Sequence, residues 1–217
     1  MNGKLIVIEG LDGSGKATQA KLLADTLAEQ GKNVRKITFP DYESDSSALV
    51  KMYLKGEFGS KPGDVNAYAA SAFYAVDRYA SFKKDWGEVY QSGGLIVADR
   101  YATSNGIHQC SKLGEGEWDE YLKWLDDFEY AKLGIPAPDV VIYLKADTEV
   151  SQKLMTGRYG GDESKKDIHE GDLEYLKRSQ AAAAYCAQKL GWKTVECVRD
   201  GQMRTIEDIH NEIMTLI

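Results

Sequence analysis

The chain has 217 residues, of which 43% are hydrophobic and 28% are charged, a composition typical of one ordinary globular domain. Its formal net charge of -7 disfavours nucleic acid as a partner, because an acidic surface repels a phosphate polymer. No apolar run reaches the roughly 18 residues of a membrane span and the amino-terminal run is too short for a signal peptide, so we expect no membrane association and a cytoplasmic location.

Short apolar runs and helical patterns alternate along the chain. Five runs have the length and composition of buried parallel strands: residues 5–8, 34–39, 95–98, 140–144 and 194–198. The last helical pattern follows Thr205, which together with Asp208 resembles a capping box. This alternation predicts an α/β fold, a three-layer sandwich in which helices flank a five-stranded parallel sheet.

The first predicted strand runs directly into Gly10-Leu-Asp-Gly-Ser-Gly-Lys16, which opens the first helical pattern. A P-loop needs this context, because its glycines let backbone N–H groups wrap a nucleotide's phosphates while its lysine reaches the β- and γ-oxygens. We therefore expect Lys16 to be a catalytic cation. The residues predicted to bind ATP here are Gly10, Leu11, Asp12, Gly13, Ser14, Gly15, Lys16, Ala17 and Thr18.

Position 17 departs from the P-loop pattern. The usual Ser or Thr after the lysine, whose hydroxyl binds Mg²⁺, is Ala17 here, and Thr18 stands one position late. Three explanations stay open: waters and other carboxylates hold the ion, Thr18 turns inward, or the site binds nucleotide without turning it over.

A long helical pattern spans residues 64–86, with Phe73 and Val76 among the apolar residues at helical spacing. Tyr74 and Arg78 are four residues apart on it, so the ring and the guanidinium share one face. A planar base can stack on the first and hydrogen-bond to the second. A half-buried tyrosine beside a solvated arginine is the alternative that this spacing leaves open.

Asp99 and Arg100 end the third predicted strand, and ligands of parallel sheets collect at the carboxyl ends of strands. An aspartate at that place can hold the hydration shell of Mg²⁺. The neighbouring arginine can clasp a phosphate with two parallel hydrogen bonds. A surface ion pair at the strand end is the open alternative.

The segment at about residues 157–171, GRYGGDESKKDIHEG, mixes glycines with both signs of charge and has almost no apolar residue to bury. This composition is typical of a mobile lid. We therefore expect residues 1–217 to form a single P-loop domain that carries one lid.

Taken together, these residues resemble the thymidylate kinase family over nearly the whole chain. The resemblance rests on LIVIEGLDGSGKATQ at 5–19, Phe39-Pro40, FYAVDR at 73–78, DRYATSN at 99–105 and IPAPD at 135–139. It implies the P-loop NTPase fold and transfer of the γ-phosphoryl group of ATP, with Mg²⁺, to dTMP, which gives dTDP and ADP. It also implies a homodimer formed through helices that include the long one.

The resemblance implies a role for each matching residue in acceptor binding. Asp12 meets the acceptor's 3'-hydroxyl, Tyr74 stacks on thymine and Arg78 bonds the base. Arg100 binds the acceptor phosphate and takes part in catalysis. Asp99 binds Mg²⁺ through water. The remaining positions assigned to the acceptor site are Phe39, Lys51, Ser104, Asn105 and His108.

Two further groups are implied around ATP. The adenine lies near the loop formed by Arg199, Asp200 and Gly201. The lid begins at Arg158, a catalytic cation that approaches the transferring phosphoryl group. Lys165 and Lys166 are two further lid cations that can accompany it, and the sequence does not decide between them.

Three departures from the family pattern keep alternatives open. His108 stands where the family often has a tyrosine that crowds the ribose 2' position, so the same reaction on dUMP or UMP is one alternative. Some members place an arginine for the acceptor phosphate where this chain has Tyr42, and Lys51 is a candidate substitute. With Ala17, a regulatory module that binds nucleotide with little turnover is the other alternative to dTMP phosphorylation.

Overall fold

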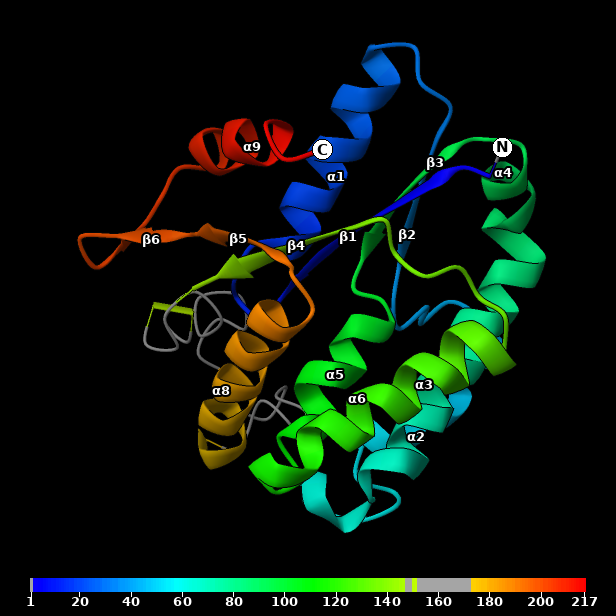
Figure 1. Cartoon of the computed structure of the whole chain (residues 1–217), viewed down its shortest axis with the longest axis vertical. Coiled ribbons are helices and arrows are strands. Elements are labelled where there is room, and N and C mark those ends of the chain that lie inside the picture. The colour runs from blue at the N-terminus through cyan, green and yellow to red at the C-terminus, as the bar shows by residue number, and fades with distance from the viewer. Residues whose placement is uncertain (1, 147–149, 152–172) are drawn as a thin grey trace.

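A parallel five-stranded sheet forms the centre of the molecule, in the strand order β2-β3-β1-β4-β5 (Figure 1). The computed structural model describes residues 2–146, 150–151 and 173–217. The predicted parallel sheet is confirmed. Three predicted runs lie inside a strand, and the runs 34–39 and 194–198 extend past the end of theirs. The strands are β1 (Lys4–Gly10), β2 (Val34–Thr38), β3 (Leu95–Asp99), β4 (Val140–Lys145) and β5 (Lys193–Glu196).

Helices cover both faces of this sheet, which gives the predicted three layers (Figure 1). On one face, Leu23 and Leu27 of α1 join Ile209 and Ile213 of α9 in a buried cluster with residues of β1, β3 and β4. The larger cluster lies on the opposite face and includes Trp86. The helices are α1 (Lys16–Glu29), α2 (Ala48–Leu54), α3 (Ala67–Ser81), α4 (Gly87–Gln91), α5 (Ala102–Cys110), α6 (Trp118–Asp126), α8 (Leu173–Lys189) and α9 (Ile206–Met214).

The predicted helix 64–86 is shorter at its start and less regular at its end. The Asn66 side chain accepts a hydrogen bond from Ala69 N at 2.8 Å, so α3 begins at Ala67. A π-helical turn, Phe82–Trp86, then joins α3 to α4. Val76 is 51% exposed and therefore does not face the core. The buried face of α3 consists mainly of small residues and Arg78.

The fifth predicted strand, 194–198, divides into two elements. β5 ends at Glu196, and Val198–Arg199 (β6) pairs with Gln202–Met203 (β7) in a separate antiparallel hairpin. Asp200 and Gly201 form its turn with φ of 52° and 72°, values that suit a two-residue hairpin turn. In Figure 1 this hairpin extends to the left of the central sheet.

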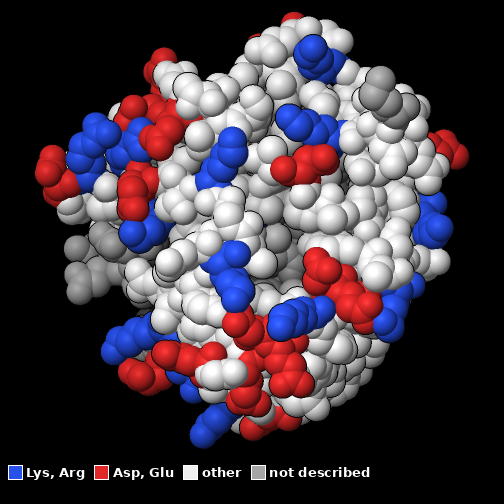
Figure 2. All heavy atoms as spheres, in the orientation of Figure 1, with Lys and Arg blue, Asp and Glu red and all other residues white. Residues whose placement is uncertain are grey.

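Charged side chains of both signs lie on the surface (Figure 2). On the face shown in Figure 2, the described Lys and Arg side chains are scattered among Asp and Glu side chains. Within the described ranges, no helix combines the length and the apolar character that crossing a bilayer requires.

Candidate active site

Two adjacent strand ends bring the predicted phosphate-binding residues together. In the parallel β1–β3 pair, Ile8 lies opposite Asp99, and Arg100 N donates to Ile8 O at 3.1 Å. Arg100 has φ of 66°, a left-handed conformation that is uncommon for a residue with a side chain and often marks functional sites. The P-loop and Arg100 therefore leave the sheet side by side, at the edge where ligands of parallel sheets bind.

The P-loop has the backbone that phosphate binding requires. Gly13 and Gly15 have φ of 80° and 89°. A Cβ on Gly13 would lie 2.6 Å from Ser151 O, whereas a Cβ on Gly15 would meet no described atom within 4 Å. α1 begins at Lys16 without a side-chain cap and without an acidic residue in its first turn. Its amino-terminal N–H groups are therefore available to an anion.

A carboxylate lies between the two cations of the site. Arg100 Nη2 donates to Asp12 Oδ1, and Lys16 Nζ is 3.6 Å from the same oxygen and donates to Leu11 O at 2.7 Å. Burial alone would raise the pKa of Asp12, but Arg100 and Lys16 hold it well below its ordinary value. Burial and Arg100 lower the pKa of Lys16 to about 8, against the opposing effect of the nearby carboxylates.

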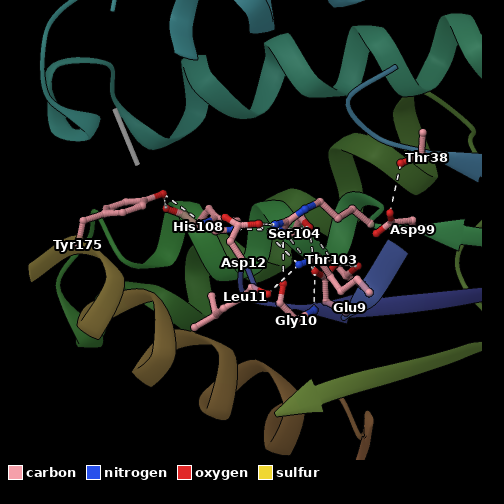
Figure 3. A network of polar contacts seen from close by, with 12 residues as sticks. Glu9, Gly10, Leu11, Asp12, Thr38, Asp99, Thr103, Ser104, His108 and Tyr175 are labelled. Carbon is pink, nitrogen blue, oxygen red and sulfur yellow. Dashed lines mark hydrogen bonds and ion pairs between the residues drawn. The ribbon is translucent and has the colours of Figure 1, made fainter. Parts of the chain in front are cut away.

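Glu9 is a site residue that the sequence interpretation missed. Its carboxylate is fully buried at the end of β1 and accepts hydrogen bonds from Thr103 at 2.8 Å and Ser104 at 2.9 Å (Figure 3). Arg100 Nη1 lies 3.8 Å from Glu9 and donates to Ser104 Oγ at 3.3 Å. A charged residue between the apolar run 5–8 and the first P-loop glycine was the available signal, since such a residue needs a partner when buried.

His108 extends this network to α8. Its Nε2 lies 3.2 Å from Arg100 Nη1, and its Nδ1 lies 3.3 Å from the hydroxyl of Tyr175 (Figure 3). The Tyr175 ring stacks on the imidazole with an interplanar angle of 18° and centroids 6.2 Å apart. An arginine only donates, so Nε2 is an acceptor in this arrangement. Tyr175 carries no motif and could not be assigned from the sequence.

The base-side residues lie in a buried polar cluster. Arg78 is 1% exposed, and its Nε donates to Glu129 Oε2 at 2.8 Å. Asn105, 2% exposed, donates to Glu129 Oε1 at 3.2 Å. The alternative of a solvated arginine is therefore wrong, because Glu129 pairs with Arg78 inside the protein. Contact of Arg78, Asn105 and the half-buried Tyr74 with a base stays a prediction.

The other predicted acceptor and metal residues are placed as follows. Phe39 is 4% exposed, and its ring lies 6.0 Å from that of Tyr101. Lys51 Nζ donates to Tyr42 O at 3.2 Å, so its charge lies beside Tyr42, and its contact with the acceptor phosphate stays a prediction. Asp99 is 9% exposed, and its carboxylate accepts a long hydrogen bond, at 3.5 Å, from Thr38.

The remaining predictions concern ATP, its metal and the lid. Ala17 and Thr18 are both exposed at the start of α1. Arg199 ends β6, and Asp200 and Gly201 form the turn of the β6–β7 hairpin, so the predicted adenine loop is this hairpin. Its contact with ATP stays a prediction. The described part of the chain contains no group of three His, Cys, Asp or Glu side chains able to hold a metal. Arg158, Lys165 and Lys166, with the whole predicted lid, lie outside the described residues.

Comparison with known proteins gives the same assignment as the motifs. The family model for thymidylate kinase matches residues 8–213. The thymidylate kinase of Mycobacterium tuberculosis is 30% identical over 190 residues, which are 87% of each chain. That of Schizosaccharomyces pombe is 27% identical and covers 99% of this chain and 91% of its own.

A solved structure supports the fold. The thymidylate kinase of Candida albicans superposes with a TM-score of 0.71 at 21% identity, over 100% of this chain and 91% of that one. With the P-loop, the parallel sheet and the Asp99-Arg100 strand end already in place, the match over residues 8–213 leaves one conclusion. The chain belongs to the thymidylate kinase family.

Proposed function

We propose that this protein transfers the γ-phosphoryl group of ATP to dTMP, with dTDP and ADP as products. The observation that carries the proposal is the pairing of two cationic sites: Lys16 on the P-loop and Arg100, directly after the neighbouring strand β3, share one carboxylate, Asp12. A module that only senses ATP needs the first cation and has no use for the second. The relatives described above are named thymidylate kinases, which supports dTMP as the acceptor.

The reaction needs two phosphates at these two cations. When ATP binds, Lys16 exchanges its hydrogen bond to the Leu11 carbonyl for one to a phosphate of ATP. Arg100 likewise exchanges its hydrogen bond to Asp12 for one to the acceptor phosphate. An oxygen of the dTMP phosphate then forms a bond to the γ-phosphorus while the bond to the β,γ-bridging oxygen breaks, and that electron pair leaves on ADP. The attacking oxygen is already ionised, so no strong general base is required. His108 then serves as a polar neighbour of Arg100 and not as a proton carrier.

Asp99 is the residue we propose for the Mg²⁺ that accompanies ATP. Its carboxylate makes a single long hydrogen bond, to Thr38, among the described residues, which leaves oxygen for a hydrated ion. Mg²⁺ keeps several waters in most protein sites, and this suits a P-loop in which Ala17 offers no hydroxyl. Bound there, the ion supplies positive charge to the phosphates of ATP.

Turnover with different acceptors tests the proposal. The purified protein with ATP and Mg²⁺ is expected to convert dTMP to dTDP, measured by chromatography of the nucleotides. Competition among dTMP, dUMP and UMP then measures how strictly the site beside His108 selects the acceptor. ATP binding without conversion of any monophosphate would favour the regulatory alternative, and an equal rate with UMP would remove the preference for a deoxynucleotide.

The oligomeric state and the location belong to the same proposal. Tyr68, Val76 and Tyr79 form an exposed apolar stripe on α3, and we propose that this stripe lies in a homodimer interface. The three cysteines, Cys110, Cys186 and Cys197, are buried free thiols, which suits a reducing compartment such as the cytoplasm.

A further inference from the structure

Glu129 is a fully buried carboxylate with no role in the reaction proposed above. It lies in the π-helical turn Asp127–Lys132 that follows α6, and such turns occur frequently at functional sites. A buried ion pair is weak evidence for a role in stability, because well-packed apolar residues often replace one without loss. The place of Glu129 therefore points to a role in positioning other groups.

Three donors converge on this carboxylate. Arg78 Nε donates to Oε2 at 2.8 Å, and Arg78 Nη2 donates to Oε1. Asn105 Nδ2 donates to Oε1 at 3.2 Å and to Ser71 O at 3.3 Å. Burial alone would lower the pKa of Arg78, but Glu129 holds it above its ordinary value, so the guanidinium stays charged.

Glu129 fixes which way both partners face. An ionised carboxylate accepts hydrogen bonds and donates none, so it draws two guanidinium nitrogens of Arg78 and the amide nitrogen of Asn105 toward itself. Arg78 Nη1 and Asn105 Oδ1 are then left without a hydrogen bond to any described residue. Arg78 and Asn105 are 1% and 2% exposed, and neither atom belongs to the enclosed side-chain atoms that lack a partner among the described residues, such as Gln109 Nε2. The cluster therefore offers one donor and one acceptor to a ligand.

This donor and acceptor lie close to the proposed acceptor-phosphate site. Asn105 follows Ser104 on α5, and Ser104 accepts a hydrogen bond from Arg100 at 3.3 Å. Tyr74 lies one helical turn before Arg78 on α3. A nucleotide whose phosphate is held by Arg100 can therefore direct its base toward the atoms that Glu129 leaves available.

We propose that Glu129 is the positioning residue that makes this site select a pyrimidine with a 4-carbonyl and an N3–H over cytosine. The proposal rests on the function proposed above. Arg78 Nη1 donates to the carbonyl, and Asn105 Oδ1 accepts from N3–H. Cytosine offers an amino group and an unprotonated N3, which sets donor against donor and acceptor against acceptor.

Glu129→Gln tests this assignment, with Asp126→Asn as the matched control, since Asp126 is an exposed carboxylate near the same turn. A glutamine can donate to Asn105 Oδ1, which lets Asn105 turn its amide nitrogen toward the substrate. We expect the KM for dTMP to rise about tenfold and the preference for dTMP over dCMP to fall about tenfold, while the KM for ATP stays near the wild-type value. The control is expected to match the wild type in all three.

A folded Glu129→Gln variant with the wild-type KM for dTMP and the wild-type preference over dCMP would overturn the proposal. Glu129→Asp keeps the charge of the pair and shortens the side chain by one carbon, so it serves if the glutamine variant does not fold. It is expected to raise the KM for dTMP severalfold, and an unchanged KM overturns the proposal equally. A wild-type protein that does not phosphorylate dTMP contradicts the proposed function instead, before any variant is compared.

Discussion

Asp12 joins the two cations of the site. Its Oδ1 accepts from Arg100 and lies 3.6 Å from Lys16 Nζ, so one carboxylate serves both cations. A phosphate oxygen can replace a carboxylate oxygen at either cation, because both are anionic acceptors of charge-assisted hydrogen bonds. In the proposed reaction, the two substrates therefore replace the contacts of Asp12 with these cations.

The pKa of Lys16 gives a pH dependence to ATP binding. Burial lowers this pKa to about 8, and only the charged ammonium attracts phosphate. As the pH rises through 8, the free protein loses the proton, so the Kd for ATP should rise toward about tenfold per pH unit above that value. Calorimetric titration with ATP from about pH 7 to about pH 9.5, at constant free Mg²⁺, measures this, because these limits span roughly one unit or more on each side of the lowered pKa.

Lys16→Arg is the control, because a guanidinium stays charged over the whole range. Its Kd for ATP is expected to be flat with pH, whatever its absolute value. A wild-type Kd that is equally flat would show that Lys16 either keeps an ordinary pKa or does not contact the phosphates.

The turn from β1 into α1 depends on Gly13 for its shape. Gly13 has φ of 80°, and the Cβ of an alanine at this position would lie 2.6 Å from Ser151 O, so Gly13→Ala forces the loop to move. Strain of this kind costs on the order of 1–3 kcal/mol, so ATP should bind roughly 10- to 100-fold more weakly to the variant. Calorimetry measures the affinity.

Gly63→Ala is the matched control, since a Cβ on Gly63 meets no described atom within 4 Å. It should leave ATP affinity unchanged. Wild-type ATP affinity in Gly13→Ala would contradict the assignment of this turn to the phosphates.

The strands and the outer helices follow from the sequence better than the irregular connections do. Thr205 caps α9 as predicted, with Asp208 N donating to its Oγ1 at 3.1 Å, because capping is a local interaction. The start of α3 at Ala67 and the division of the run 194–198 were missed. Both depend on short-range details, the Asn66 cap and the left-handed turn at Asp200, that apolar spacing does not reveal.

The proposed homodimer depends on an exposed surface of α3. Tyr68, Val76 and Tyr79 are 41%, 51% and 39% exposed on α3. A charge in the middle of an apolar interface is costly, so Val76→Glu should convert the proposed dimer to a monomer. Light scattering coupled to size-exclusion chromatography measures the mass.

Ile206→Glu is the comparison variant, since Ile206 is also exposed but lies on α9. It should remain a dimer. A monomeric wild-type protein, or a Val76→Glu variant that stays dimeric, would contradict the proposed interface.

The sequence predicts those parts of the site whose residues belong to one motif. It does not predict the parts that form where distant elements meet. The P-loop and Asp99-Arg100 carry their signal in consecutive residues, and the β1–β3 register then brings them together. Glu129 and Tyr175 reach the site from elements far along the chain, and no local pattern marks them. Their positions depend on partners that only the fold supplies.

A crystal structure with Mg²⁺, ADP and dTMP tests the account most directly. It is expected to show the β-phosphate of ADP inside the amides of residues 10–16, with Lys16 moved from the Leu11 carbonyl to the phosphate, and Arg100 moved from Asp12 to the phosphate of dTMP. A P-loop without phosphate, with Lys16 still on Leu11 and Arg100 still on Asp12, would contradict it.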